Sequence, residues 1–336
     1  MNLDDYLELI RAGNSMSRSE AESFLSLIID DSDLPDEKIA AALNILTDSQ
    51  VAAEEVCGFV DAMRARMVHV PYSGQAIDTC GTGGDRHGTF NISTAAAILL
   101  SAGGVNVAKH GNRAATSKCG SADVLEALGI PVDLTPEMAS KVLSERGFVF
   151  LFAPLYHPSL KRLIQVRRQL GRPTVFNLLG PLLNPAGVKR QVVGTFSLTN
   201  AELLAEVMSR MDYEHAIVLT SEDGLDEASL DATVDIFEIK GSTVTGKRLQ
   251  ASDYGLEPAP ISALSGGDAG ENARLITAAL NPSGELNAHQ RITVFNAALG
   301  FYVSGQSDSV EAGIKKAKQV LASGAAAAKL KQLQAK

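Results

Sequence analysis

The sequence predicts an α/β protein: a large domain with a central, mostly parallel sheet flanked by helices, plus a small all-helical domain. Residues 1–70 carry helix signals and no strand signal. From residue 76 onward, short apolar runs alternate with helical patterns, which is typical of parallel sheets. Within 78–123, two polar loops each follow a predicted strand and precede a predicted helix. These observations place the candidate site in the larger domain.

Composition and charge exclude several classes of protein. The chain has 336 residues, 45% of them apolar and 21% charged, which suggests about two domains. Its net charge of −9 and pI near 5.2 argue against nucleic acid or an anionic membrane as partner. Acidic residues stand where a signal peptide would be basic, and no long apolar span follows. The three cysteines lack metal-ligand spacing, so we expect reduced thiols in a cytoplasmic protein.

The first 70 residues predict three or four amphipathic helices. Ser17 and Glu20 form a capping box ahead of an apolar-periodic run that includes Phe24 and Ile28. Pro35 marks the start of a further helix, and the pattern continues over 52–67. No catalytic constellation occurs here. We interpret this region as a small helical domain or a subunit interface.

The stretch 78–123 has the features of a phosphate or pyrophosphate site. An apolar lead-in runs into a glycine loop closed by Asp85, and Asn91 is placed to cap the next helix. A second strand, 105–108, leads into the loop Lys109–Arg113, and another helix begins near Ser121. Loops at the carboxyl ends of parallel strands bind ligands, and free N–H groups at helix N-termini bind anions. No acidic residue lies between Asp85 and Asp123, whereas four basic residues do: Arg86, Lys109, Arg113 and Lys118.

Two standard phosphate motifs do not fit. The Gly81-x-Gly83 pair resembles the start of a dinucleotide fingerprint, but the sixth position is Arg86 rather than glycine. The Gly246-Lys247 pair is followed by arginine, so it is not a P-loop. The glycines could serve tight turns alone, but two consecutive loops with hydroxyls and no acids favour an anion site.

Two charged segments lie farther along the chain. A predicted helix over 157–172 carries five basic residues and no acid, which suits a solvated face and an anionic substrate equally well. Residues 221–227 place four carboxylates directly after a predicted strand, 216–220. Mg²⁺ takes one or two carboxylates together with substrate phosphates and waters. Beside a phosphate site, we therefore favour a metal loop over a solvated acidic turn.

Four motifs together resemble the anthranilate phosphoribosyltransferase family: 78–85 (DTCGTGGD), 91–94 (NIST), 109–113 (KHGNR) and 176–181 (FNLLGP). Segments 225–227, 271–273 and 296–298 also match, so the resemblance covers essentially the whole chain, without a fused glutamine-amidotransferase segment. The resemblance implies a helical domain of residues 1–70 joined by part of 165–185, and an α/β domain of residues 71–336. It also implies a homodimer formed through the helical domains.

The same resemblance implies a reaction, transfer of the phosphoribosyl group of phosphoribosyl pyrophosphate to the amine of anthranilate in tryptophan biosynthesis, and a set of site residues. No catalytic residue is certain; Mg²⁺, expected as two ions, and Lys109 would stabilise the leaving group. Phosphoribosyl pyrophosphate would contact Gly81, Gly84, Asp85, Thr89, Asn91, Ser93, Thr94, Lys109, His110, Gly111, Asn112 and Ser121. Anthranilate would contact Gly81, His110, Asn112 and Arg167, and the metal would be held by Ser93, Asp226 and Glu227.

Two alternatives stay open from the sequence. A pyrimidine-nucleoside phosphorylase shares this fold and a similar glycine loop, but that family has a Lys-His-Ser run where this chain has Asp78-Thr79-Cys80. A non-catalytic nucleotide-binding protein would not need the acidic loop. Turnover that depends on Mg²⁺ separates this second alternative from an enzyme.

Overall fold

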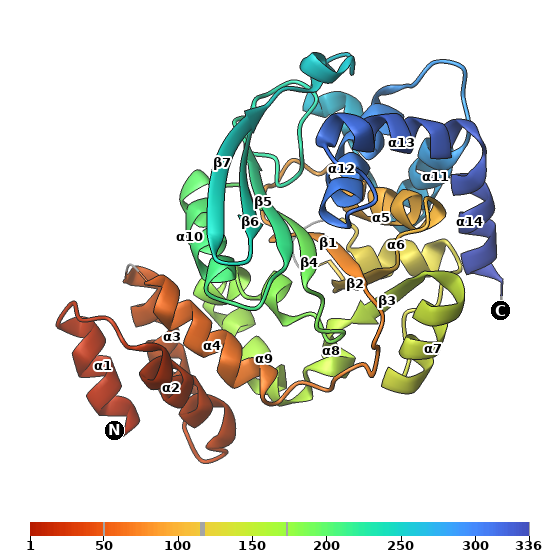
Figure 1. Ribbon diagram of the computed structural model, residues 1–336. Helices are drawn as coiled ribbons and strands as arrows, with labels where there is room; N and C mark the ends of the chain where they lie inside the picture. The colour runs from red at the N-terminus through yellow and green to blue at the C-terminus, as the bar shows by residue number, and fades with distance from the viewer. Residues whose placement is uncertain (50, 115–117, 173, 336) are drawn as a thin grey trace.

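The computed structural model describes residues 1–49, 51–114, 118–172 and 174–335. Residues 115–117 of the predicted phosphate site therefore lie outside the described part. The chain forms a helical N-terminal region beside a larger α/β region (Figure 1). The predicted fold class is confirmed. No helix within the described residues is long and apolar enough to cross a membrane.

The N-terminal region contains four helices: α1 (Leu3–Arg11), α2 (Arg18–Asp30), α3 (Asp36–Asp48) and α4 (Ala53–Arg64). The capping box at Ser17 is confirmed, because its side chain accepts a hydrogen bond from the Glu20 N–H while the Glu20 carboxylate accepts from the Ser17 N–H. The helices bury apolar residues such as Phe24 and Phe59. The same core includes side chains from the segment 160–183 and from helix α10.

A seven-stranded sheet organises the rest of the chain, with strand order β3-β2-β1-β4-β5-β6-β7. Five strands are parallel: β1 (Ile77–Gly81), β2 (Val107–Gly111), β3 (Phe148–Phe152), β4 (Arg190–Gly194) and β5 (His215–Ser221). The hairpin of β6 (Val234–Lys240) and β7 (Thr243–Leu249) is antiparallel, and β6 also pairs antiparallel with β5. The parallel strands are largely buried, because helices cover both faces of this sheet.

Helices connect the strands and cover the sheet. The first half has α5 (Ile92–Ala102), α6 (Ser121–Ala127), α7 (Pro136–Arg146), α8 (Ala153–Tyr156), α9 (Lys161–Leu170) and α10 (Leu198–Ser209). The C-terminal part has α11 (Ala269–Leu280), α12 (Ala288–Val303), α13 (Val310–Ala322) and α14 (Ala325–Gln334). Helices α5 and α12 pack together and contact the central strands, whereas α10 packs against β5 and β6 from the other face (Figure 1).

Short 3₁₀ helices complete the chain: η1 (Pro158–Leu160), η2 (Val175–Asn177), η3 (Gly180–Leu183), η4 (Ala251–Tyr254) and η5 (Ile261–Leu264). The prediction of one helix over 157–172 was wrong at its two ends. The 3₁₀ turn Pro158–Leu160 precedes α9, which begins at Lys161. Gly171, in a left-handed conformation with φ 63°, ends α9 before residue 172.

Candidate active site

The site lies where the direction of chain progression across the sheet reverses. From β1 the chain moves outward to β2 and β3, and then returns to β4 and β5 on the other side. Strands β1 and β4 are paired in register, so that Gly81 and Gly194 end side by side. Ligands of open α/β sheets bind at such a reversal, outside the carboxyl ends of the strands.

Asp226 occupies this reversal point, and two glycines make room for it. A Cβ added at Gly81 would lie 2.3 Å from Asp226 Oδ2, and one at Gly194 would lie 1.7 Å from the Asp226 carbonyl oxygen. Real Cβ atoms essentially never approach within 3.0 Å. Glycine at these positions therefore lets the acidic loop after β5 descend between the two strand ends.

The glycine loop presents backbone N–H groups to this carboxylate. Gly83 and Gly84 have φ values of 70° and 93°, which residues with a side chain rarely adopt. This conformation directs the Gly83 N–H toward Asp226 Oδ2, at 2.8 Å. One N–H donor of the glycine loop is therefore engaged by a carboxyl group of the protein itself.

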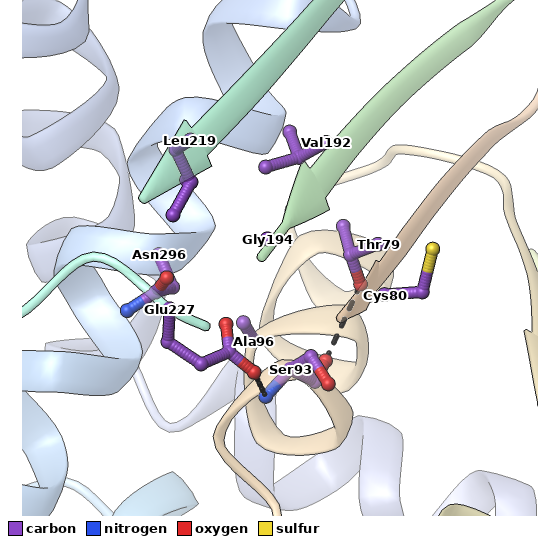
Figure 2. Close-up of a pocket in the computed structure, with 9 residues that line it drawn as sticks. All are labelled: Thr79, Cys80, Ser93, Ala96, Val192, Gly194, Leu219, Glu227 and Asn296. Carbon is purple, nitrogen blue, oxygen red and sulfur yellow. Dashed lines mark hydrogen bonds between the residues drawn. The ribbon is translucent and has the colours of Figure 1, made fainter. Parts of the chain in front are cut away.

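Glu227 lies over the N-terminus of α5. Its Oε1 accepts a hydrogen bond from the Ser93 N–H at 3.0 Å, and the pair faces a cavity that Thr79 also lines (Figure 2). Lys109, only 2% exposed, donates from Nζ to the Thr79 carbonyl at 2.6 Å and to Ser93 Oγ at 3.3 Å. The structure thus brings Ser93, Lys109, Asp226 and Glu227 together from three separate segments of the chain.

The acidic pair is electrostatically suited to a cation. Burial raises the pKa of Asp226, and the nearby Asp85 carboxyl group raises it further. Burial also raises the pKa of Glu227, as does the charge of Asp226, whereas Lys109 acts in the opposite direction. The described residues contain no cluster of three His, Cys, Asp or Glu side chains that would hold a metal by itself. Two carboxylates and the Ser93 hydroxyl nevertheless fit Mg²⁺, which completes its shell with substrate phosphates and water.

The remaining acids of the loop have other partners. Glu222 pairs with Arg248, and Asp223 accepts a hydrogen bond from the Ser229 hydroxyl at 2.6 Å. Of the four acidic residues in this loop, Asp226 and Glu227 therefore remain the candidate metal ligands.

Asn91 is the N-cap residue of α5, as the sequence predicts, but its side chain makes no capping hydrogen bond. Its Oδ1 accepts from Asn272 Nδ2 at 2.9 Å, and its Nδ2 donates to the Cys119 carbonyl at 3.2 Å. The amide joins three segments instead. Thr94, fully buried one turn into the helix, has a hydroxyl oxygen without a hydrogen-bond partner in the described structure.

The second loop is built around close backbone approach. A Cβ at Gly111 would lie 2.4 Å from Ser121 Oγ, and that hydroxyl donates to the Asn112 carbonyl at 3.3 Å. Gly111, Asn112 and Ser121 are therefore neighbours, as expected of one binding loop. Thr89 lies at the far end of the glycine loop, in an isolated bridge with Ser265.

The basic residues of the stretch do not all face the site. Arg113 forms ion pairs with Asp123 and Glu126 of α6. Arg86 and Lys118 are exposed. The charge pattern in the sequence therefore overstates the positive charge of the site, and Lys109 is the basic side chain that contacts its other residues in the described structure.

Two of the four candidate acceptor residues, His110 and Arg167, lie beside the segment 176–181. Arg167 donates from a terminal nitrogen to Asn177 Oδ1 at 2.9 Å and packs over the Phe176 ring, 5.8 Å from the centroid. Its Nε is buried without a hydrogen-bond partner, and burial lowers its pKa. His110 is buried beside the Gly180 carbonyl, so the segment links the two predicted acceptor residues.

His157 is a residue of this region that sequence reasoning missed. Its ring packs against that of His110, with centroids 5.2 Å apart, although 47 residues separate them in the chain. Burial lowers the pKa of His110 to about 3 and that of His157 to about 4, so both rings are neutral near pH 7. The carbonyls of Gly180 and Leu183 lie near the rings, but His110 Nε2 and both nitrogens of His157 lack a well-formed hydrogen bond in the described structure. In the sequence around His157, the local feature that could have drawn attention to it is the proline that follows, Pro158.

Asp78 also has a role that local patterns do not reveal. It is fully buried in β1, and its carboxylate accepts hydrogen bonds from the His110 N–H at 3.3 Å and from Asn184 Nδ2 at 2.9 Å. Burial raises its pKa to about 6. Asp78 thereby fixes the backbone of the second loop relative to the first strand.

Comparison with known proteins assigns the chain to a family. Residues 73–327 match the model described as "Glycosyl transferase family, a/b domain", and residues 4–67 match its helical bundle domain. Anthranilate phosphoribosyltransferase of Chlorobium chlorochromatii is 44% identical, over 99% of this chain and 95% of that protein. The Bacillus pumilus enzyme of the same name is 42% identical, over 99% and 98%.

Solved structures agree with the sequence relatives. Anthranilate phosphoribosyltransferase of Thermus thermophilus has a TM-score of 0.91 and 36% identity, covering 98% of each chain. The Saccharomyces cerevisiae enzyme in complex with PRPP and Mg has a TM-score of 0.89 and 27% identity, covering 98% of this chain and 96% of that one. The chain belongs to the anthranilate phosphoribosyltransferase family.

Proposed function

We propose that the site between β1, β4 and α5 carries the family's reaction in this chain. In that reaction the 5-phosphoribosyl group of phosphoribosyl pyrophosphate passes to the amine of anthranilate, giving N-(5-phosphoribosyl)anthranilate and pyrophosphate. The observation that supports this site most strongly is the acidic pair Asp226–Glu227, held on N–H groups of the glycine loop and of α5. A yeast relative in complex with PRPP and Mg agrees with such a site.

The chemistry explains why no strong general base is needed. An aromatic amine is neutral and nucleophilic near pH 7, so the barrier comes from breaking the bond between ribose C1 and the pyrophosphate oxygen. Negative charge builds on the leaving group, and fixed positive charge or N–H donors beside it lower the barrier. Lys109 is in place to serve as such a donor, and the N–H groups of Gly83 and Ser93 face the same site although Asp226 and Glu227 accept their hydrogen bonds.

The same geometry accounts for a metal requirement. Three carboxyl groups, those of Asp85, Asp226 and Glu227, surround a site that contains one contacting ammonium group, Lys109. These carboxyl groups would repel a pyrophosphate ester. Two N–H donors of the site, those of Gly83 and Ser93, are also engaged by Asp226 and Glu227. Mg²⁺ would supply the positive charge that offsets these carboxyl groups and the charge of the leaving group. We infer that Asp226, Glu227 and the Ser93 hydroxyl would hold it, with two ions as the family resemblance implies.

The acceptor is assigned to the segment that joins His110 and Arg167. A yeast relative forms a complex with 4-fluoroanthranilate, a ligand of the same chemistry. A planar guanidinium can bind a carboxylate through two parallel hydrogen bonds, and the unpartnered Nε of Arg167 is one available donor. We propose that Arg167 binds the anthranilate carboxylate, while Gly81, His110 and Asn112 line the path of the amine toward the ribose.

A fluorescence assay tests the proposed function. Anthranilate is fluorescent and the chain contains no tryptophan, so the protein background is low. Purified protein should cause loss of anthranilate fluorescence only when phosphoribosyl pyrophosphate and Mg²⁺ are both present. Formation of pyrophosphate in equal amount confirms the transfer. Failure of all three components together to consume anthranilate would overturn the proposal.

We also propose the assembly that the resemblance implies. Residues 1–70, with part of 165–185, would act as one small helical domain beside the α/β domain of residues 71–336 and would form the contact of a homodimer. Leu27 on α2 is 37% exposed, and other apolar side chains of these helices are only partly buried, which favours burial against a second copy. Cys57, Cys80 and Cys119 form no disulfide in the described part of the chain, which suits the reducing cytoplasm.

A further inference from the structure

The buried side-chain amide of Asn296 on α12 forms hydrogen bonds with the acidic loop, residues 222–233. Asn296 is 4% exposed, and a buried amide is costly unless its polar atoms are hydrogen-bonded. Its Oδ1 accepts from the Ala228 N–H at 2.9 Å, and its Nδ2 donates to the Ala228 carbonyl at 3.1 Å and to the Ile292 carbonyl at 3.0 Å. The side chain thus pairs with both backbone groups of one residue, as a neighbouring β-strand would.

The residue to which Asn296 bonds, Ala228, directly follows the proposed metal-binding pair. Ala228 is fully buried and comes after Asp226 and Glu227. In Figure 2, Asn296 lies next to Glu227 on the wall of the cavity whose other side is formed by β1 and α5. Both hydrogens of its Nδ2 are used, so the amide has no donor left for a substrate. Its contacts indicate a role in geometry rather than in direct binding.

The acidic loop depends on such side-chain contacts. Residues 222–233 contain no helix or strand, so regular backbone hydrogen bonds do not fix the direction of the two carboxylates. Ser221 Oγ donates a hydrogen bond to the Glu227 carbonyl at 2.7 Å and accepts one from the Ser229 N–H at 3.1 Å. That contact comes from the strand that leads into the loop, whereas Asn296 comes from a separate helix that also packs on α5.

We propose that Asn296 is a positioning residue for the metal site: its two hydrogen bonds to Ala228 hold Asp226 and Glu227 at the carboxyl ends of β1 and β4. The inference rests on the proposed function in assigning a metal to this pair. This clamp, the pair of hydrogen bonds from Asn296 to Ala228, is present in the protein without ligands. Loosening it should therefore weaken metal binding more than it weakens binding of the acceptor.

The test compares two buried amides on the same helix. Asn296→Ala removes both bonds to Ala228. Gln290→Ala is the matched control, because Gln290 is 1% exposed and bonds to Asn281, Ser283 and Asn287, away from the acidic loop. Asn296→Ser is the second variant, because a helical serine can keep the bond to the Ile292 carbonyl while losing Ala228. The serine variant takes the place of Asn296→Ala in the test if the alanine variant does not fold.

Two measurements do not require turnover. Hydrogen–deuterium exchange of residues 221–231, without metal, reports the clamp directly. Titration with Mn²⁺ and pyrophosphate, followed by the electron paramagnetic resonance signal of free Mn²⁺, reports metal affinity. Loss of two hydrogen bonds should speed exchange and weaken Mn²⁺ binding by about ten- to a hundredfold in the Asn296 variants. Gln290→Ala should lower the thermal midpoint without changing either value.

The kinetic signature should match. In the Asn296 variants the Mg²⁺ concentration for half-maximal rate should rise by a similar factor, while the KM for anthranilate changes less than about threefold. Unchanged exchange and Mn²⁺ affinity in a folded Asn296 variant would overturn the inference, as would equal effects in Gln290→Ala. If the wild-type protein does not consume anthranilate, the proposed function fails, while exchange and Mn²⁺ titration still decide the role of Asn296.

Discussion

Substitution of Gly81 by alanine tests the placement of Asp226 with a single added methyl group. The backbone of Gly81 is not left-handed, so alanine causes no conformational strain of its own. Its Cβ would meet Asp226 Oδ2 at 2.3 Å, and the carboxylate must withdraw beyond 3.0 Å. In doing so it loses the hydrogen bond from the Gly83 N–H, now 2.8 Å long.

The size of the effect follows from that lost contact. A hydrogen bond to a charged group contributes about 1.5–3 kcal/mol, or roughly ten- to more than a hundredfold in an equilibrium constant. We expect the Mg²⁺ concentration for half-maximal rate in Gly81→Ala to rise by about that factor. The thermal midpoint should fall less in Gly81→Ala than in Gly194→Ala, because the displaced atom is the end of a side chain that can rotate rather than a backbone oxygen.

The anthranilate fluorescence assay across a Mg²⁺ titration measures this shift, and circular dichroism measures the thermal midpoint. Gly246→Ala is the control, because a Cβ at Gly246 meets no atom within 4 Å. Gly194→Ala gives the contrast: its Cβ would lie 1.7 Å from a backbone oxygen, and overpacking of this kind costs about 1–3 kcal/mol or more of stability. A folded Gly81→Ala protein with unchanged Mg²⁺ dependence would refute the assignment of Asp226 to the metal.

Four further outcomes are expected. Asp226→Ala should lose most turnover while its circular dichroism spectrum stays native, and near-normal rates at ordinary Mg²⁺ would remove the acidic loop from the site. Arg167→Ala should raise the anthranilate KM by about ten- to a hundredfold and leave that of phosphoribosyl pyrophosphate nearly unchanged, whereas the exposed Arg168→Ala should do much less; equal effects on both substrates would indicate general electrostatic attraction. Light scattering at micromolar concentration should give twice the chain mass of 35.4 kDa, and a monomer mass would contradict the dimer. His110 and His157 have lowered pKa values, so the folded protein binds fewer protons than the unfolded chain and loses stability as pH falls below about 6.5. Since His157→Phe removes one of these groups, urea unfolding should show the variant gaining about 2 kcal/mol relative to wild type between about pH 8 and about pH 5, and a pH-independent difference would contradict the lowered pKa.

The local sequence determined the elements and the kind of chemistry. The strand predicted over 216–220 lies within β5, and Ser17 with Glu20 predicted the start of α2. Glycine loops, helix starts and acidic residues after strands are local patterns, set by backbone sterics and hydrogen bonding within a few residues. They sufficed to predict an anion site and a metal loop on a mostly parallel sheet.

Only the tertiary structure decided which side chains meet. Asn91 is the N-cap residue of α5, but its side chain bonds to Asn272, 181 residues away, instead of to its own helix, and Arg113 is paired with Glu126. The approach of Asp226 to Gly81 depends on β4 pairing with β1 in register, which no local pattern specifies. The order and register of strands are set by how the whole hydrophobic core packs, and contacts between distant segments follow from that packing.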